Sequence, residues 1–201
     1  MTQVIRGGGR SSDAACMTPR DPGTRTDAAS IFGPFRADHV RVLAQLTALE
    51  RAMAGAGGGF DAAAEAGMDA LVRLLRRQFA THVAAEEAAL YPALVEALPE
   101  TAPRLAPLTA EHRDMRTMLV RLQQLLEQPA TPARDEQVVV QARDLVDLLR
   151  IHIHKEELAV FDVAARVLDA PGLARLATRL GRHDHGNDPT TGASAGKGLD
   201  R

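Results

Sequence analysis

Apolar residues recur at helical spacing along most of the chain, and almost no segment alternates as a strand does. Four long stretches show this pattern, and "GAGGG" and "QPATP" end two of them. The long helices are expected at about 35–54, from between Phe60 and Ala64 to past Leu90, after the "APRLAP" of 102–107, and from about Arg134 to Val163, with a shorter one at about 172–180. The pattern predicts an all-α protein, an up-down-up-down four-helix bundle with a short extra C-terminal helix.

Both ends of the chain lack this periodicity and are rich in small and polar residues. Their composition predicts a disordered tail over residues 1–30 and another over 183–201. Between them, residues 31–182 are expected to form one domain, since a chain of 201 residues is long enough for a single hydrophobic core. Met17 is an alternative start, because everything before it is without pattern.

Composition narrows the class of protein. The 24 basic and 26 acidic residues leave a net charge of -2, which argues against a nucleic-acid partner. The single cysteine, Cys16, cannot form an internal disulfide. No apolar core of a signal peptide and no run of about 18 apolar residues is present, so neither secretion nor a membrane span is expected. These features predict a cytoplasmic protein.

Two short segments of the chain each occur in two similar copies. "HVAAEEAALY" from His82 matches "HIHKEELAVF" from His152, and "ADHVRVL" around His39 matches "AEHRDMRTML" around His112. The order along the chain is therefore H, HxxxE, H, HxxxE. This order predicts two copies of one helical hairpin, related by a pseudo-twofold axis.

The repeated histidines and glutamates lie on the apolar faces of the expected helices. Residues at i and i+4 differ by about 40° around a helix, so His82 projects with Glu86, and His152 with Glu156. A single histidine on an apolar face is more commonly a hydrogen-bonded core residue. A whole set is different, because buried carboxylates facing imidazoles are costly unless a cation neutralises them. The pattern therefore predicts a metal site.

Nitrogen and oxygen donors of this kind suit a pair of first-row transition-metal ions. Imidazole with carboxylate favours two iron ions, with manganese or zinc as substitutes. The candidate metal ligands are His39, His82, Glu86, His112, His152 and Glu156.

These six positions, with their order and helical placement over about 35–168, resemble the hemerythrin-like family of HHE cation-binding domains. The resemblance implies a four-helix bundle with a non-haem diiron centre, in which Glu86 and Glu156 bridge the two irons. Oxygen-carrying members have a fifth histidine where this chain has Arg116, and HxxxxD where it offers Glu156 or Glu157. The departure argues against simple reversible oxygen carriage and favours the six-ligand branch of the family.

Neighbours of the candidate ligands allow more than one role. Glu87 and Glu157 are either acceptors for the outer N–H groups of the ligand imidazoles or exposed residues on a helix flank. His154 is expected at the surface. Tyr91 lies about 180° from His82 on an ideal helix, which predicts packing between helices rather than contact with a metal. Pro92 predicts a disturbance of its helix.

The expected partners of such a centre are dioxygen, nitric oxide and hydrogen peroxide. Two roles remain open, a catalase-like enzyme that consumes peroxide and a non-catalytic oxygen, redox or iron sensor or handling protein. A ferritin-like carboxylate oxidase would require Glu-x-x-His on paired helices, and the chain has no such pair. A metal-free helical interaction module is the remaining alternative.

Overall fold

The computed structural model describes residues 27–55 and 60–186, and all regular structure within them is helical. Two π-helical segments, η1 (Glu86–Leu90) and η3 (Glu156–Val160), and a 3-10 turn, η2 (Pro99–Thr101), join longer helices. Those helices are α1 (Ala28–Gly55), α2 (Ala62–Ala85), α3 (Tyr91–Ala97), α4 (Ala102–Leu126), α5 (Pro132–Lys155), α6 (Phe161–Val167) and α7 (Ala170–Gly186). The predicted all-α bundle with an extra C-terminal helix is confirmed.

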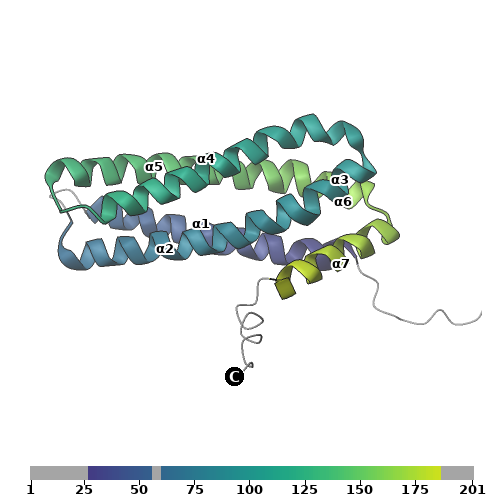
Figure 1. The fold of residues 1–201 in the computed structure, drawn as a ribbon, viewed down its shortest axis with the longest axis horizontal. Helices are drawn as coiled ribbons and strands as arrows, with labels where there is room; N and C mark the ends of the chain where they lie inside the picture. Colours follow the sequence, from purple (N-terminus) through teal and green to yellow (C-terminus); the bar gives the residue numbers. More distant parts are fainter. Residues whose placement is uncertain (1–26, 56–59, 187–201) are drawn as a thin grey trace, which may run out of the picture.

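The bundle consists of α1, the continuous α2–η1–α3, α4, and the continuous α5–η3–α6 (Figure 1). α1 packs beside α2 and α5, and α4 packs beside the same two helices. α7 crosses the lower layer at the end of the bundle where α3 and α6 lie (Figure 1). None of the described helices is long and apolar enough to cross a membrane.

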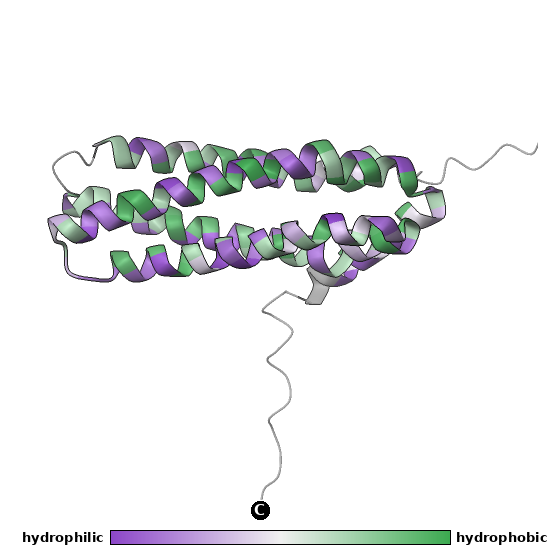
Figure 2. Ribbon diagram, turned by 90° about the horizontal axis from the view of Figure 1, so that it is seen from above, coloured by the Kyte–Doolittle hydropathy of each residue, from purple (hydrophilic) through white to green (hydrophobic). Residues whose placement is uncertain are grey.

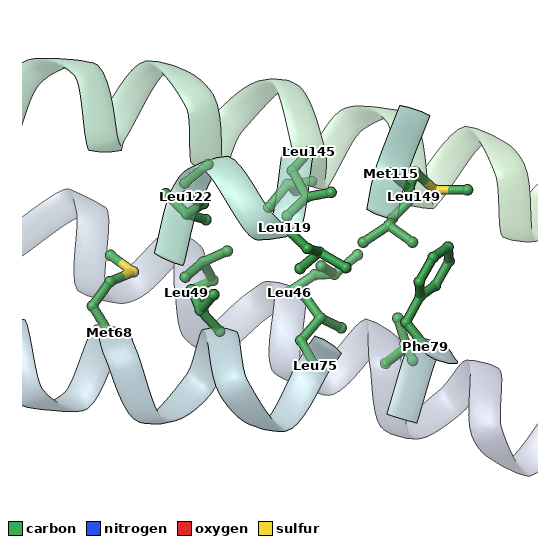
Figure 3. Close-up of a cluster of buried hydrophobic side chains, with 14 of the residues drawn as sticks. Leu46, Leu49, Met68, Leu75, Phe79, Met115, Leu119, Leu122, Leu145 and Leu149 are labelled. Carbon is green, nitrogen blue, oxygen red and sulfur yellow. The ribbon is translucent and has the colours of Figure 1, made fainter. Parts of the chain in front are cut away.

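Every long helix mixes hydrophobic and hydrophilic residues along its length (Figure 2), and its buried residues mostly recur every three or four positions, as on one face of a helix. The buried side chains form two clusters. The first lies between α1, α2, α4 and α5, where Leu46, Leu119 and Leu145 meet (Figure 3). The second surrounds Phe32 and Phe161 at the α3–α6 end and includes Leu176 of α7. Along each long helix, the candidate ligands lie between these clusters.

Two helices begin earlier than the sequence pattern predicts. α1 starts at Ala28 rather than near residue 35, because Ile31 and Phe32 are buried in the second cluster and hold the first turns in place despite Pro34. Its first three residues belong to the segment expected as a tail. The prolines of "APRLAP" do not delay α4, which starts at Ala102 with a proline in its first turn, where no N–H is lost.

At the other end, α7 is longer than the expected 172–180 and takes in residues on both sides. Leu173 and Leu176 are buried, and Arg179 pairs with Glu96 of α3 at 2.8 Å. Residues 183–186 of the expected C-terminal tail belong to α7. Residues 1–26 and 187–201 lie outside the described residues, and Cys16 and Met17 are among them.

Pro92 does not break its helix. It stands at the start of α3, directly after the π-helical segment η1. The second copy has an equivalent segment, η3, followed by Asp162 where the first copy has proline. In both copies the amide following the segment bonds the carbonyl five residues back, from Tyr91 to Glu86 and from Phe161 to Glu156. The disturbance is therefore a π-helical turn, and it does not require proline.

Candidate metal centre

The structure brings all six predicted ligands together in the middle of the bundle. Each histidine comes from a different helix, and the two glutamates open the π-helical segments η1 and η3. All six side chains are buried. They form two overlapping groups that could each hold a cation, one of His39, His82, Glu86 and Glu156, the other of Glu86, His112, His152 and Glu156.

The four imidazoles form two pairs. The Nε2 atoms of His39 and His82 are 3.0 Å apart, and those of His112 and His152 are 2.9 Å apart. We call these pairs the first half and the second half of the centre. In each half, a single-histidine helix faces an HxxxE helix, as the repeat predicts.

The two carboxylates span both halves. Glu86 places one oxygen 3.1 Å from Nε2 of His82 and the other 3.5 Å from Nε2 of His112. Glu156 places one oxygen 3.3 Å from Nε2 of His39 and the other 3.3 Å from Nε2 of His152. Each carboxylate therefore offers one oxygen to each half, as a bridging ligand requires.

The donors in the centre are poorly satisfied without a cation. Both oxygens of Glu86 and one oxygen of Glu156 are buried without a hydrogen bond, so the close approach of His82 to Glu86 is a contact only. Burying a carboxylate without partners is costly, and a cation between imidazoles and carboxylates removes that cost. The residues present thus fit a pair of metal ions.

Proton affinities show how strongly these groups interact. Burial and the charge of Glu156 raise the pKa of Glu86 to about 7. Burial opposes protonation of His82, but the charge of Glu86 and contacts with Asp38 and Glu86 raise the pKa of His82 to about 10. Burial would also raise the pKa of Glu156, yet interactions with His152, His39 and Tyr91 hold it well below its usual range. A metal ion would replace protons in this cluster, because ligand imidazoles must be neutral.

Each imidazole turns its Nδ1 atom away from the centre toward another carboxylate. An Nδ1–H donated outward leaves the Nε2 lone pair directed into the cluster, which is the form that binds metal. The pairs are His39 with Glu157 (2.8 Å), His112 with Glu87 (2.9 Å), His82 with Asp38 (3.4 Å) and His152 with Glu111 (2.9 Å).

These contacts decide between the two roles left open for Glu87 and Glu157, which are both imidazole acceptors. Asp38 and Glu111 were missed in the sequence. Their signal was present, since an acidic residue directly precedes the single histidine in both copies, "DH" and "EH". The sequence alone did not assign a role to this acidic residue, because the histidine that it contacts lies on the neighbouring helix.

The family model of the hemerythrin HHE cation binding domain matches residues 31–164. The chain belongs to this family. The match contains all six candidate ligands and ends within α6, so α7 lies beyond it. No curated protein and no solved structure matches the chain.

Arg116, which replaces the fifth histidine of oxygen-carrying hemerythrins, does not point into the centre. Its guanidinium donates to Glu87 at 3.0 Å, and its side chain is 40% exposed. The pairing with Arg116 and His112 holds the pKa of Glu87 below its usual value against the effect of burial. The other outer carboxylates also have a cationic partner, in the pairs Arg36–Glu157, Arg41–Asp38 and Lys155–Glu111.

Tyr91 lies closer to the hemerythrin-like centre than predicted. Its hydroxyl donates to Glu156 at 2.6 Å, and its ring stacks on His112 with centroids 5.9 Å apart. Burial and the nearby carboxylates raise its pKa, which keeps the hydroxyl protonated. Tyr91 packs between helices, as predicted, and its hydroxyl also reaches Glu156 because η1 is π-helical and turns less per residue than an α-helix. His154 is exposed, as expected.

Proposed function

We propose that this protein holds a non-haem diiron centre and reacts there with a small oxidant or diatomic molecule: hydrogen peroxide, nitric oxide or dioxygen. The supporting observation is the pair of buried donor groups that share Glu86 and Glu156. Each group has two imidazole nitrogens and two carboxylates, a set that favours iron over manganese or zinc. His39, His82, Glu86, His112, His152 and Glu156 are the proposed ligands.

Iron bound there would supply a reversible change of oxidation state. The protein orients the ligands, donates a hydrogen bond to one of them and keeps water away from the centre. Outer carboxylates orient the four imidazoles, Tyr91 donates a hydrogen bond to Glu156, and apolar clusters on both sides exclude water. The surrounding cations offset the outer carboxylates, so the centre is held in a nearly neutral shell.

The donor count favours reaction with an added ligand over storage of metal alone. Four protein donors per ion are fewer than the roughly six of octahedral coordination, so both ions keep room for a further ligand. Arg116 is occupied by Glu87 and does not close either half. Room at both ions suits a molecule that contacts both, which favours peroxide consumption or reaction with nitric oxide over stable oxygen carriage.

The test begins with metal content after expression in iron-replete medium. We expect about two iron atoms per chain. Stoichiometric zinc without iron would refute the diiron centre.

The reactivity test uses the iron-loaded protein with hydrogen peroxide, and the reduced iron-loaded protein with nitric oxide or dioxygen. Steady peroxide turnover indicates an enzyme, whereas a single reaction without turnover indicates a sensor or iron-handling protein. A stable dioxygen complex that reverses under vacuum, without peroxide decomposition, would favour oxygen carriage instead.

A further inference from the structure

A pocket of about 270 Å³ opens between α3, the start of α4, and the η3–α6 segment. Its lining is almost entirely apolar. The charged residues of the lining, Glu100 and Arg104, are exposed. The apolar lining comprises Leu94, Leu98, Leu105, Leu108, Val160 and Val163, with Ala159 beside them.

The pocket offers little to a polar molecule. Thr101 is the one buried polar residue among its lining residues, and its hydroxyl donates to the carbonyl of Leu98 at 2.7 Å. Water in a cavity needs two to four polar partners, and cavities lined by aliphatic side chains stay dry and take up apolar molecules such as xenon. This lining therefore favours apolar molecules over water or hydrogen peroxide.

The inner wall of the pocket adjoins the second half of the centre. Leu108 precedes His112 by four residues on α4, so the two side chains share a helix face. Val160 closes the π-helical segment that Glu156 opens. Both Leu108 and Val160 are buried. Two lining residues of the pocket thus lie about one helical turn along the chain from ligands of this half.

The equivalent place beside the first half is filled. Phe35 precedes His39 by four residues, as Leu108 precedes His112, and its ring meets His82 edge-on at 5.6 Å. Phe32 occupies the position equivalent to Leu105 and stacks on Phe161 at 5.6 Å. α7 also packs against η1 and α1 on this side. The duplicated bundle therefore closes one half with phenylalanine rings and leaves a pocket beside the other.

We propose that this pocket admits neutral diatomic gases, dioxygen and nitric oxide, to the His112–His152 half of the centre. The proposal rests on the diiron function proposed above and concerns the route by which the gaseous ligands reach the centre. The pocket is larger than one diatomic molecule, so it acts as an apolar reservoir next to the centre and not as a fitted binding site.

Xenon tests the pocket itself. The full-length protein is examined with dissolved xenon by 129Xe NMR and as a crystal under xenon pressure. We expect xenon beside Leu105 and Val160. Ala159→Phe, at the pocket mouth, should abolish this binding, whereas Leu158→Phe, at a neighbouring position that is 63% exposed, should leave it unchanged. Absence of xenon from the wild-type pocket would overturn the proposal.

Kinetics test the route. Reduced, iron-loaded Ala159→Phe should react several-fold more slowly than wild type with dioxygen and nitric oxide, with unchanged iron content and a smaller effect on peroxide. Val163→Phe provides a second plug if Ala159→Phe folds poorly, and Leu158→Phe is the control. Wild-type gas rates in both plugged variants, or an equal loss of the peroxide rate, would overturn the gas route while leaving the diiron function. A protein that takes up xenon but binds no iron would refute the diiron function instead.

Discussion

In the first half of the centre, Phe161 stacks on His39 with centroids 5.5 Å apart and offers no polar atom to either glutamate. In the second half, the equivalent residue is Tyr91, which stacks on His112 and donates its hydroxyl to Glu156. Tyr91 and Phe161 occupy the same position in the two copies of the hairpin. Because only Tyr91 has a hydroxyl, Glu156 receives a hydrogen bond, whereas Glu86 receives none.

The outer residues diverge in the same way. Both halves use an outer carboxylate on each imidazole, but the supporting cations come from unrelated positions, Arg36 for Glu157 and Arg116 for Glu87. Arg36 also lies over the Phe161 ring at 5.5 Å. The donors facing the centre are the same in both copies while their surroundings differ, which makes the two halves of the centre chemically unequal.

Replacing a shared carboxylate should have the largest effect, because it removes a donor from both halves at once. We expect Glu86→Ala and Glu156→Ala each to lose most of the bound iron, measured by elemental analysis of protein purified without a tag. Folding is checked by circular dichroism. Retention of two irons by either variant would show that the carboxylates do not bridge.

Replacing one imidazole should affect one half more than the other. His39→Ala should release the ion of the first half first, and His152→Ala that of the second half, so each variant should retain one ion more tightly. His154→Ala is the matched control, because this exposed histidine lies two positions from His152. Iron loss in His154→Ala with retention in His152→Ala would contradict the assignment of the ligands on α5.

Outer carboxylates should matter less than ligands, and by comparable amounts in the two halves. Glu87→Ala and Glu157→Ala should each weaken metal affinity by roughly 10–100-fold, because the imidazole loses the acceptor that orients it. Affinities are compared by competition with a chelator. Glu136→Ala, at an exposed position outside the centre, is the control. An unaltered affinity in both variants would mean that packing alone orients the rings.

The smallest effect is expected for Tyr91→Phe, which gives both halves a phenylalanine at the position that stacks on a histidine. Tyr91→Phe removes the hydrogen bond to Glu156 and should destabilise the metal-free protein by about 1.5 kcal/mol, the lower end for a bond to a charged group. Thermal or denaturant unfolding measures this change. In the iron-loaded protein, Mössbauer spectra should show two less distinct irons in Tyr91→Phe than in wild type. Identical spectra would place the origin of any inequality elsewhere.

The sequence alone predicts which residues of the centre share a helix face. Helical periodicity placed the histidines and glutamates on buried faces, and the HxxxE spacing placed His82 with Glu86 and His152 with Glu156 on one face each. Four helices with short connections left few ways to arrange them. These inferences succeed because local spacing determines which side chains share a helix face.

Tertiary structure alone decided the rest. The partner of His39 is Glu157, more than a hundred residues away, and neighbouring-helix geometry brings Asp38 to His82. Ideal-helix arithmetic could not foresee the π-helical turns that bring Tyr91 to Glu156, because their i to i+5 bonds leave no periodic signature. The pocket beside the second half depends on the volumes of side chains from three segments packed together, such as Leu105 where the first copy has Phe32. The sequence by itself determined which residues meet within a helix, whereas contacts between helices depend on packing that no single stretch of chain specifies.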